Sequence, residues 1–295
     1  MKYFILLFTV FFSVSVFSKT IEFYFPNYAN KEYVVSLNKG SFQDTIQTGV
    51  LDDEGRFVLI VPERANEYAG IVNWNIGEGG GMGFIMDKGN FAISCTVPEP
   101  SGQDIVFSNT EENAFLKDIF LRQSTLLKKI DVINGGKEAY SDDKTLYRVF
   151  EKEMLKLKKG YDNMYKELNQ SKLYAARYFR LTGFLNGVKP YLVIDDNNGE
   201  NKDIEDALYY INEEVDLETV YTSGLWYRFI NYITGYYPDE EAYGKGMIKL
   251  LDRTPSREIC EAFLKDAIVM SKEHKLSVLE EIFTSRLSSL KEKQD

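Results

Sequence analysis

The sequence predicts an α+β fold in which an N-terminal antiparallel β-sandwich is followed by an all-helical domain. Short apolar runs separated by turn residues occupy positions 19–107, whereas apolar residues recur at helical spacing from position 108 to the end. The chain has 295 residues, of which 44% are hydrophobic and 14% aromatic, so it is long enough to bury one or two separate cores.

Residues 1–18 have the pattern of a signal peptide. Lys2 precedes an apolar stretch at Phe4–Phe12, and Ser18 is a small residue suited to the position before a cleavage site. We therefore expect a periplasmic or secreted mature protein. The alternative is an uncleaved anchor. However, the run is short for a membrane span and no second apolar run follows, so we expect no stable span once the signal is removed.

Residues 19–107 have the pattern of an antiparallel sandwich domain. Turn sequences occur at Asn38–Gly40, Asp52–Gly55 and Asp87–Asn90, and they separate runs rich in β-branched and aromatic residues. Because these short runs recur at regular spacing, two packed sheets are expected. The expected strands are Ile21–Phe25, Tyr33–Leu37, Phe57–Val61, Tyr68–Ile76, Gly83–Met86, Phe91–Thr96 and Ile105–Phe107.

The pattern changes at Ser108, where we place the start of a helical domain over residues 108–295. Ser108 and Glu111 have the spacing of a capping box, which predicts a first helix that runs to about Ile130. Ser141–Asp143 is expected to open a second helix, whose apolar residues recur at spacings that predict packing along a partner helix. These apolar residues are Phe150, Met154, Leu157, Tyr161, Met164 and Leu168.

Further helices are expected in the rest of this domain. Thr254 is predicted to cap one of them, with Pro255 at its first helical position. The apolar faces of the strands and of the helices should each pack against elements of their own kind. We therefore expect a separate hydrophobic core in each half, and the two halves should be separable near Ser108. The expected helices are Leu173–Leu185, Ile204–Ile211, Leu217–Tyr236, Ala242–Leu251, Pro255–Met270 and Leu276–Leu290.

The charge and the counts of His and Cys argue against several classes of partner and of catalytic site. Lys and Arg total 35 against 45 Asp and Glu, and no basic patch stands out, so nucleic acid is not expected as a partner. One His and two Cys leave little material for a zinc site or a nucleophilic triad, and we expect no catalytic residue, cofactor or metal site. Cys95 and Cys260 are expected to be small buried hydrophobes, although export would permit a disulfide between them.

Two local motifs suggest chemistry that their spacing does not support. Ile76–Gly83 is rich in glycine, but a phosphate loop needs a helix after it and a strand is expected there, so a hairpin loop is favoured. Asp195–Asn201 is dense in oxygen ligands, but its glycine, Gly199, places Ile194 at the first position of an EF-hand loop. A solvated acidic turn is therefore favoured, and weak calcium binding stays open.

Aromatic residues gather near the end of the expected helix at Leu217–Tyr236. Trp226, Tyr227, Tyr236 and Tyr237 are candidate ligand contacts, because an exposed aromatic platform can stack on sugars or peptides. Positions 226, 229, 233 and 236 also have the spacing of a helix face that packs into a core, and this interpretation is favoured.

Four segments resemble parts of exported thioredoxin-like proteins of the Bacteroidota, the thiol-disulfide oxidoreductase and peroxiredoxin-related group. The segments are Asp52–Phe57, Phe84–Phe91, Ser108–Asn113 and Glu214–Leu217. The resemblance implies an N-terminal β-sandwich of unknown function and then a helical segment. In that family a thioredoxin domain would begin where this sequence stops, and its Cys-x-x-Cys motif has no counterpart here. Redox activity is therefore not carried over.

These observations favour an exported, non-enzymatic binding or accessory module that meets a protein or small-molecule ligand in the periplasm or cell envelope. One alternative is a redox-associated partner of a separate thioredoxin-like protein. Another is a hydrolase with an unrecognised carboxylate site, because the 45 acidic residues include no pair with a distinguishing context. The sequence alone leaves enzymatic activity open.

Overall fold

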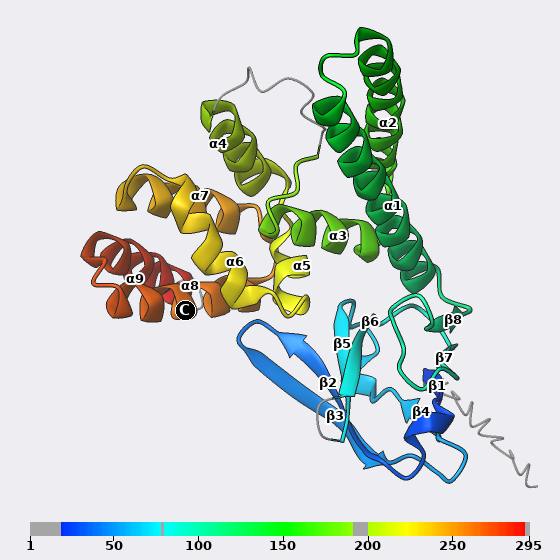
Figure 1. The fold of residues 1–295 in the computed structure, drawn as a ribbon. Coiled ribbons are helices and arrows are strands. Elements are labelled where there is room, and N and C mark those ends of the chain that lie inside the picture. The colour runs from blue at the N-terminus through cyan, green and yellow to red at the C-terminus, as the bar shows by residue number, and fades with distance from the viewer. Residues whose placement is uncertain (1–18, 78–79, 191–199, 293–295) are drawn as a thin grey trace, which may run out of the picture.

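The computed structural model describes residues 19–77, 80–190 and 200–292. It confirms the α+β prediction, since two four-stranded sheets come first in the chain and helices follow (Figure 1). The predicted signal peptide lies outside the described residues, as do positions 78–79 of the glycine motif and 195–199 of the acidic motif. None of the helices in the described ranges has the length and apolar character needed to cross a membrane.

The strands form two sheets that pack face to face. One sheet has the order β4-β1-β7-β8 and the other β3-β2-β5-β6. Neighbouring strands run antiparallel except β1 and β7, which are parallel because the chain passes through the other sheet between them. The strands are β1 (Thr20–Tyr24), β2 (Glu32–Lys39), β3 (Phe42–Val50), β4 (Arg56–Ile60), β5 (Ile71–Ile76), β6 (Gly80–Ile85), β7 (Phe91–Ser94) and β8 (Val106–Ser108).

Two parts of the sheets differ from the sequence prediction. Strand β3 is not predicted, because its side chains are half-buried or exposed and show no apolar alternation. Gly80 and Gly81 are expected in a hairpin loop but lie in β6, paired with β5, so this strand begins before the predicted start at Gly83. Hydrogen bonding to a neighbouring strand, rather than side-chain pattern, determines both elements.

The sandwich core is built from closely packed aromatic rings. Phe23 stacks on Phe57 with ring centroids 4.2 Å apart, and Trp74 lies 5.0 Å from Phe23 and 4.5 Å from Phe25. These rings come from both sheets and are at most 8% exposed. Burying rings of this size gives the largest single-residue contributions to stability.

Side-chain amides pair with the backbone at two sheet edges. Gln47 donates to the carbonyl of Val58 at 3.1 Å and accepts from the N–H of Ile60 at 3.2 Å, so it takes the place of a strand beside β4. Asn113 does the same beside β6, where it accepts from Ile85 N–H at 2.7 Å and donates to Ile85 C=O at 2.8 Å.

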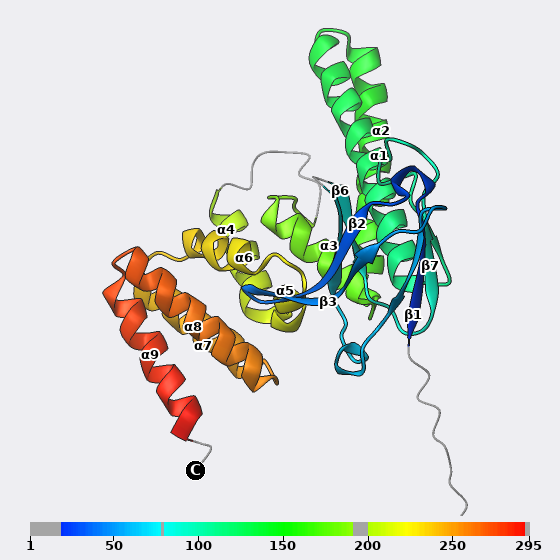
Figure 2. The ribbon, with the colours of Figure 1, turned by 90° about the horizontal axis from the view of Figure 1, so that it is seen from below.

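The helices form a projecting hairpin and a compact bundle. Helices α1 and α2 make the hairpin, and α3–α6 lie between this hairpin and α7–α9 (Figures 1 and 2). The helices are α1 (Glu111–Ala139), α2 (Lys144–Gln170), α3 (Tyr174–Leu185), α4 (Glu200–Tyr209), α5 (Leu217–Thr222), α6 (Trp226–Ile233), α7 (Glu240–Asp252), α8 (Arg257–Glu273) and α9 (Ser277–Glu292). A π-helical turn, η3 (Tyr210–Glu214), continues α4, and a 3-10 turn, η4 (Thr234–Tyr236), continues α6.

The apolar seam predicted for α2 is confirmed. Met154, Tyr161, Met164 and Leu168 are buried, and α2 packs along α1. Asp143 caps its N-terminus by accepting from two backbone N–H groups.

Several predicted helix boundaries are wrong. Ser108 ends β8, and Thr110 caps α1 instead by accepting from the N–H of Asn113. Helix α1 also runs on past Ile130 to Ala139, because packing against α2 overrides the helix-weakening glycines near its end.

Two further corrections concern the C-terminal helices. Ser256, not Thr254, caps α8, so Pro255 precedes the cap. The single helix expected at Leu217–Tyr236 is broken between α5 and α6, where Gly224 has a φ of +76° that a helix cannot accept.

The sandwich and the helices also contact each other. The N–H of Gly40 donates to the carbonyl of Tyr221 at 2.7 Å. Ile71 and Ile85 on the outer face of the β3-β2-β5-β6 sheet form an apolar cluster with Tyr174 and Ala175 of α3. Three larger apolar clusters lie wholly within one region each, one among the strands and two among the helices.

Candidate functional site

The two cysteines are separate and buried. Cys95 and Cys260 are both free thiols, and each lies near backbone carbonyls, Val97 for Cys95 and Leu251 for Cys260. Burial raises the pKa of the Cys260 thiol. A buried thiol with a raised pKa is a poor nucleophile, so Cys260 behaves as a packing group. Cys95 is buried in the apolar core of the sandwich.

The four aromatic residues singled out in the sequence do not form one platform. Trp226 is 1% exposed and donates its Nε1–H to Asp266 at 2.7 Å, so the core interpretation holds for it. Tyr237 donates to Asn212 at 3.0 Å, and burial raises its pKa to about 12. Tyr227 is 56% exposed. Tyr236 lines a cavity that the other three do not line.

That cavity has a volume of about 350 Å³ and lies where α3, α4, η3 and η4 meet the C-terminal half of α2. More than half of its lining residues are apolar or aromatic, with charged groups among the rest. The lining residues are Tyr165, Asn169, Arg180, Phe184, Gly187, Val188, Lys189, Pro190, Asp203, Asp206, Ala207, Tyr209, Tyr210, Glu214 and Tyr236.

An aromatic cluster forms one wall of the cavity. The ring of Phe184 lies 4.8 Å from that of Tyr210 and 5.7 Å from that of Tyr236, measured between centroids. The hydroxyl of Tyr236 donates to that of Tyr232 at 3.0 Å, which fixes the orientation of its ring. Rings held in this way can contact a planar apolar group without reordering, which lowers the entropic cost of binding.

Ion pairs lie at two positions on the cavity wall. Arg180 pairs with Glu214, and its guanidinium lies 5.4 Å from the ring centre of Tyr210. Lys189 pairs with Asp203 at 2.7 Å. Because each cation already has a carboxylate partner, the site favours a ligand with a polar group over one with a large net charge.

Local backbone geometry positions this wall. Helix α3 ends in a Schellman-type turn, in which Gly187 at φ +69° and Val188 hydrogen-bond back to Phe184 and Gly183. Lys189 follows this turn and lines the cavity. At the other side α4 widens into the π-helical turn that begins at Tyr210, a distortion that is frequent at functional sites.

Three tyrosines of the cavity, Tyr165, Tyr210 and Tyr236, keep their protons at neutral pH. Burial raises the pKa of Tyr165, Tyr210 and Tyr236 above the ordinary value for tyrosine. Their hydroxyls therefore remain neutral donors and acceptors, which suits recognition of a ligand oxygen or nitrogen.

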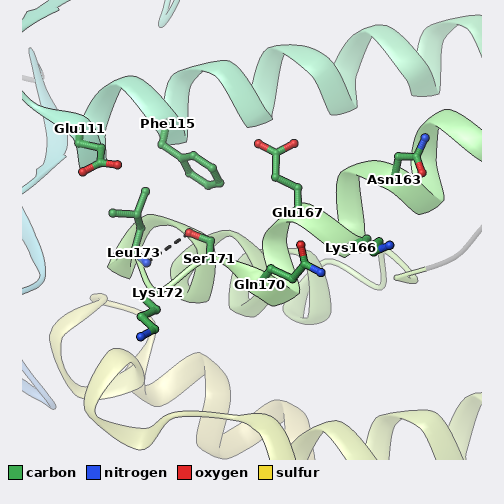
Figure 3. Close-up of a pocket in the computed structure, with 9 residues that line it drawn as sticks. All are labelled: Glu111, Phe115, Asn163, Lys166, Glu167, Gln170, Ser171, Lys172 and Leu173. Atoms are coloured by element: carbon green, nitrogen blue, oxygen red, sulfur yellow. Dashed lines mark hydrogen bonds between the residues drawn. The ribbon is translucent and has the colours of Figure 1, made fainter.

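A second concavity of about 540 Å³ lies between α1, the end of α2 and the start of α3 (Figure 3). Phe115 and Leu173 form its apolar part, with Glu111 and Glu167 at its sides (Figure 3). This groove is broad and open to solvent, and Glu167 is already paired with Arg122 at 2.8 Å. The more enclosed aromatic cavity is the better candidate site, because enclosure removes more ligand surface from water.

Sequence reasoning missed most of the aromatic cavity. Arg180 and Phe184 come from α3 and Tyr210 from η3, more than twenty positions further along the chain, and only the end of the aromatic run at Tyr236 gave a signal. No cluster of three or more metal-ligating side chains occurs within the ranges the structure describes. The chain matches no protein-family model and no curated protein.

Proposed function

We propose that this chain is a ligand-binding protein whose aromatic cavity takes a small amphipathic molecule. The observation that carries the proposal is the combination of the Phe184, Tyr210 and Tyr236 rings with neutral hydroxyls and paired charges around one enclosed space. A planar apolar part would pack on the rings, and a polar part would reach the hydroxyls or the ion pairs at the wall.

We further propose that the protein acts outside the cytoplasm. The support is the signal-peptide pattern of Lys2, Phe4–Phe12 and Ser18, and the family resemblance points the same way. N-terminal sequencing of the mature protein tests this part by itself, and a protein that retains Met1 in the cytoplasm would contradict it. The redox-associated alternative has less support, because Cys95 and Cys260 are buried and unpaired.

Anilinonaphthalene sulfonate is a suitable probe, because it has a planar, apolar naphthalene ring and a single sulfonate group. We expect saturable binding with enhanced fluorescence. Ala207→Phe adds a ring inside the cavity and should weaken binding at least tenfold, since the ring occupies the ligand's space.

Ala139→Phe is the matched control, because Ala139 is exposed at the far end of α1. Circular dichroism checks that both variants keep the helix content of the parent protein. Equal binding by the parent, Ala207→Phe and Ala139→Phe would place the probe elsewhere and contradict the proposal. Tyr209→Ala is a second variant. Tyr209 lines the cavity but is 60% exposed, so its loss should weaken probe binding less than Ala207→Phe does.

A further inference from the structure

The solvent face of α2 carries a stripe of basic residues. The seam at Met154, Tyr161 and Leu168 packs on α1, so the residues on the opposite side of the helix face solvent. All of them are exposed, and none lines the aromatic cavity. They comprise five cations, three uncharged polar residues and one leucine. We call this set the basic stripe, and its members are Thr145, Arg148, Lys152, Leu155, Lys156, Lys159, Asn163, Lys166 and Gln170.

The basic stripe contains no carboxylate, although the sequence around it does. Glu151, Glu153 and Asp162 lie between its members along the chain. Because successive residues of a helix are about 100° apart, these three side chains project from the flanks of the stripe. This alternation is why no basic patch stands out along the sequence.

The stability of the helix does not explain the basic stripe. Lys156 pairs with Glu153, but the other four cations of the stripe have no ion-pair partner within the described ranges. Arg148 and Lys152 are one turn apart, as are Lys152 and Lys156, and like charges at this spacing destabilise a helix. A binding partner of opposite charge would explain why these residues occur together.

The charge of the hairpin differs in sign from that of the whole molecule. Residues 128–159, which include most of the basic stripe, contain nine Lys and Arg against six Asp and Glu, a net charge of +3 in a chain of net charge −10. The hairpin of α1 and α2 projects beyond the sandwich and the other helices (Figures 1 and 2). An anionic surface would therefore attract the hairpin and repel the remainder of the chain, which favours an orientation with α2 towards that surface.

The composition of the basic stripe favours a lipid surface over a protein or a nucleic acid. Four of its five cations are lysine, whose ammonium lacks the fork by which arginine recognises a single carboxylate or phosphate. The stripe has no aromatic residue of the kind that anchors protein interfaces or stacks on bases. Leu155 is 61% exposed, with Lys152 and Lys159 one turn away on either side. An exposed leucine among lysines suits the boundary between lipid headgroups and acyl chains.

We propose that the basic stripe binds α2 along the surface of an anionic phospholipid bilayer. The lysines reach the lipid phosphates, and Leu155 enters the boundary of the acyl chains. Several weak charge contacts along one helix supply the affinity, so salt should weaken the binding. The basic stripe and the aromatic cavity share no residue, so each proposal can fail without the other.

Co-sedimentation with vesicles of phosphatidylglycerol or of phosphatidylcholine tests the proposal. The chain used begins at Lys19 and keeps every described residue, because the apolar run at Phe4–Phe12 would bind lipid by itself. We expect binding to phosphatidylglycerol vesicles at least about tenfold tighter than to phosphatidylcholine vesicles, and its loss in about 0.5 M salt.

A double variant tests whether the basic stripe makes the contact. Lys152→Gln with Lys159→Gln should weaken binding to phosphatidylglycerol vesicles at least about tenfold, since each lysine near an anionic surface contributes about fivefold. Lys245→Gln with Lys265→Gln is the matched control, because it makes the same change of net charge at exposed positions of α7 and α8. This control should stay within about twofold of the parent.

The apolar member of the stripe distinguishes a bilayer from a soluble polyanion. Leu155→Gln should weaken vesicle binding about threefold or more and leave any affinity for polyglutamate unchanged, because only the bilayer offers an apolar layer. Val269→Gln, at a 54% exposed position of α8, is the control and should alter neither. Circular dichroism checks that all variants keep the helix content of the parent.

Several outcomes would overturn the proposal. One is equal binding, or no binding, to the two kinds of vesicle. Another is equal binding to phosphatidylglycerol vesicles by the parent and the Lys152→Gln, Lys159→Gln variant. Binding to polyglutamate as tight as to the vesicles and unaffected by Leu155→Gln would assign the stripe to an acidic macromolecule. A parent oligomer that the double variant dissociates would assign it to the acidic remainder of a second copy.

Discussion

The sandwich core and the aromatic cavity use the same class of residue for different purposes. In the sandwich, Phe23, Phe57 and Trp74 pack ring against ring with almost no polar atoms. Around the cavity, Tyr210 and Tyr236 carry hydroxyls, and an ion pair of Arg180 lies beside them. Aromatic content therefore does not distinguish burial from binding. The distinction lies in the polar atoms that accompany the rings and in the space left between them.

The largest expected effect comes from separating the two regions. A chain that begins at Asn109 should be soluble and predominantly helical by circular dichroism, because the helices bury large clusters of their own. The fragment starts at Asn109 because β8, which ends at Ser108, belongs to the sandwich. An unfolded fragment, beside an intact chain that folds cooperatively, would show that the two regions depend on one core.

A single core substitution should have the next largest effect. Phe23→Ala removes a ring that is 2% exposed and contacts four other aromatic side chains, so the free energy of unfolding should fall by about 3–5 kcal/mol. Urea denaturation measures the change. Tyr227→Ala, at a 56% exposed position, should cost no more than about 0.5 kcal/mol. Similar losses for both variants would refute the claim that the sandwich core is densely packed.

Alkaline pH should act on the helical region more than on the phenylalanine-rich sandwich core. Burial raises the pKa of Tyr237 and Tyr221 to about 12, whereas an unfolded tyrosine titrates near 10. Between these values the native state holds more protons than the unfolded state. The free energy of unfolding is therefore unaffected below about pH 10 and falls as the pH rises towards 12.

Removing the hydroxyl of one buried tyrosine tests how far this tyrosine accounts for the loss of stability at alkaline pH. Tyr237→Phe should make the alkaline decline shallower by up to about 1.4 kcal/mol per pH unit, because one titrating group is lost. Urea unfolding at a series of pH values measures the slope, and Phe57→Leu in the sandwich is the control that should leave it unchanged. An unaltered slope in Tyr237→Phe would show that this tyrosine titrates alike in both states.

Periodic features of the fold could be predicted from the sequence, and features made by distant residues could not. The seam of α2 follows from one side-chain period, so Met154, Tyr161 and Leu168 are buried as predicted. Strand β3 has no such period, because it lies at a sheet edge and buries little. Gly224 breaks the expected long helix only because its φ is positive, which the apolar spacing does not reveal.

Of the residues that line the candidate site, the sequence analysis singled out one. Tyr236 was singled out as an aromatic residue, but it lines the cavity because α6 ends in η4 beside Phe184 of α3. Glu214, which pairs with Arg180, lies in the π-helical turn after α4. Neither the turn nor the pairing has a pattern along the chain.

The central claim is that the aromatic cavity, and not the open groove beside Phe115, binds a small amphipathic ligand. A crystal structure of the protein with anilinonaphthalene sulfonate tests it most directly. The account predicts the naphthalene ring in contact with Phe184 and Tyr210, with the sulfonate directed towards the hydroxyls or the ion pairs of the wall. Density for the probe in the groove of Figure 3, with the cavity empty, would contradict the account.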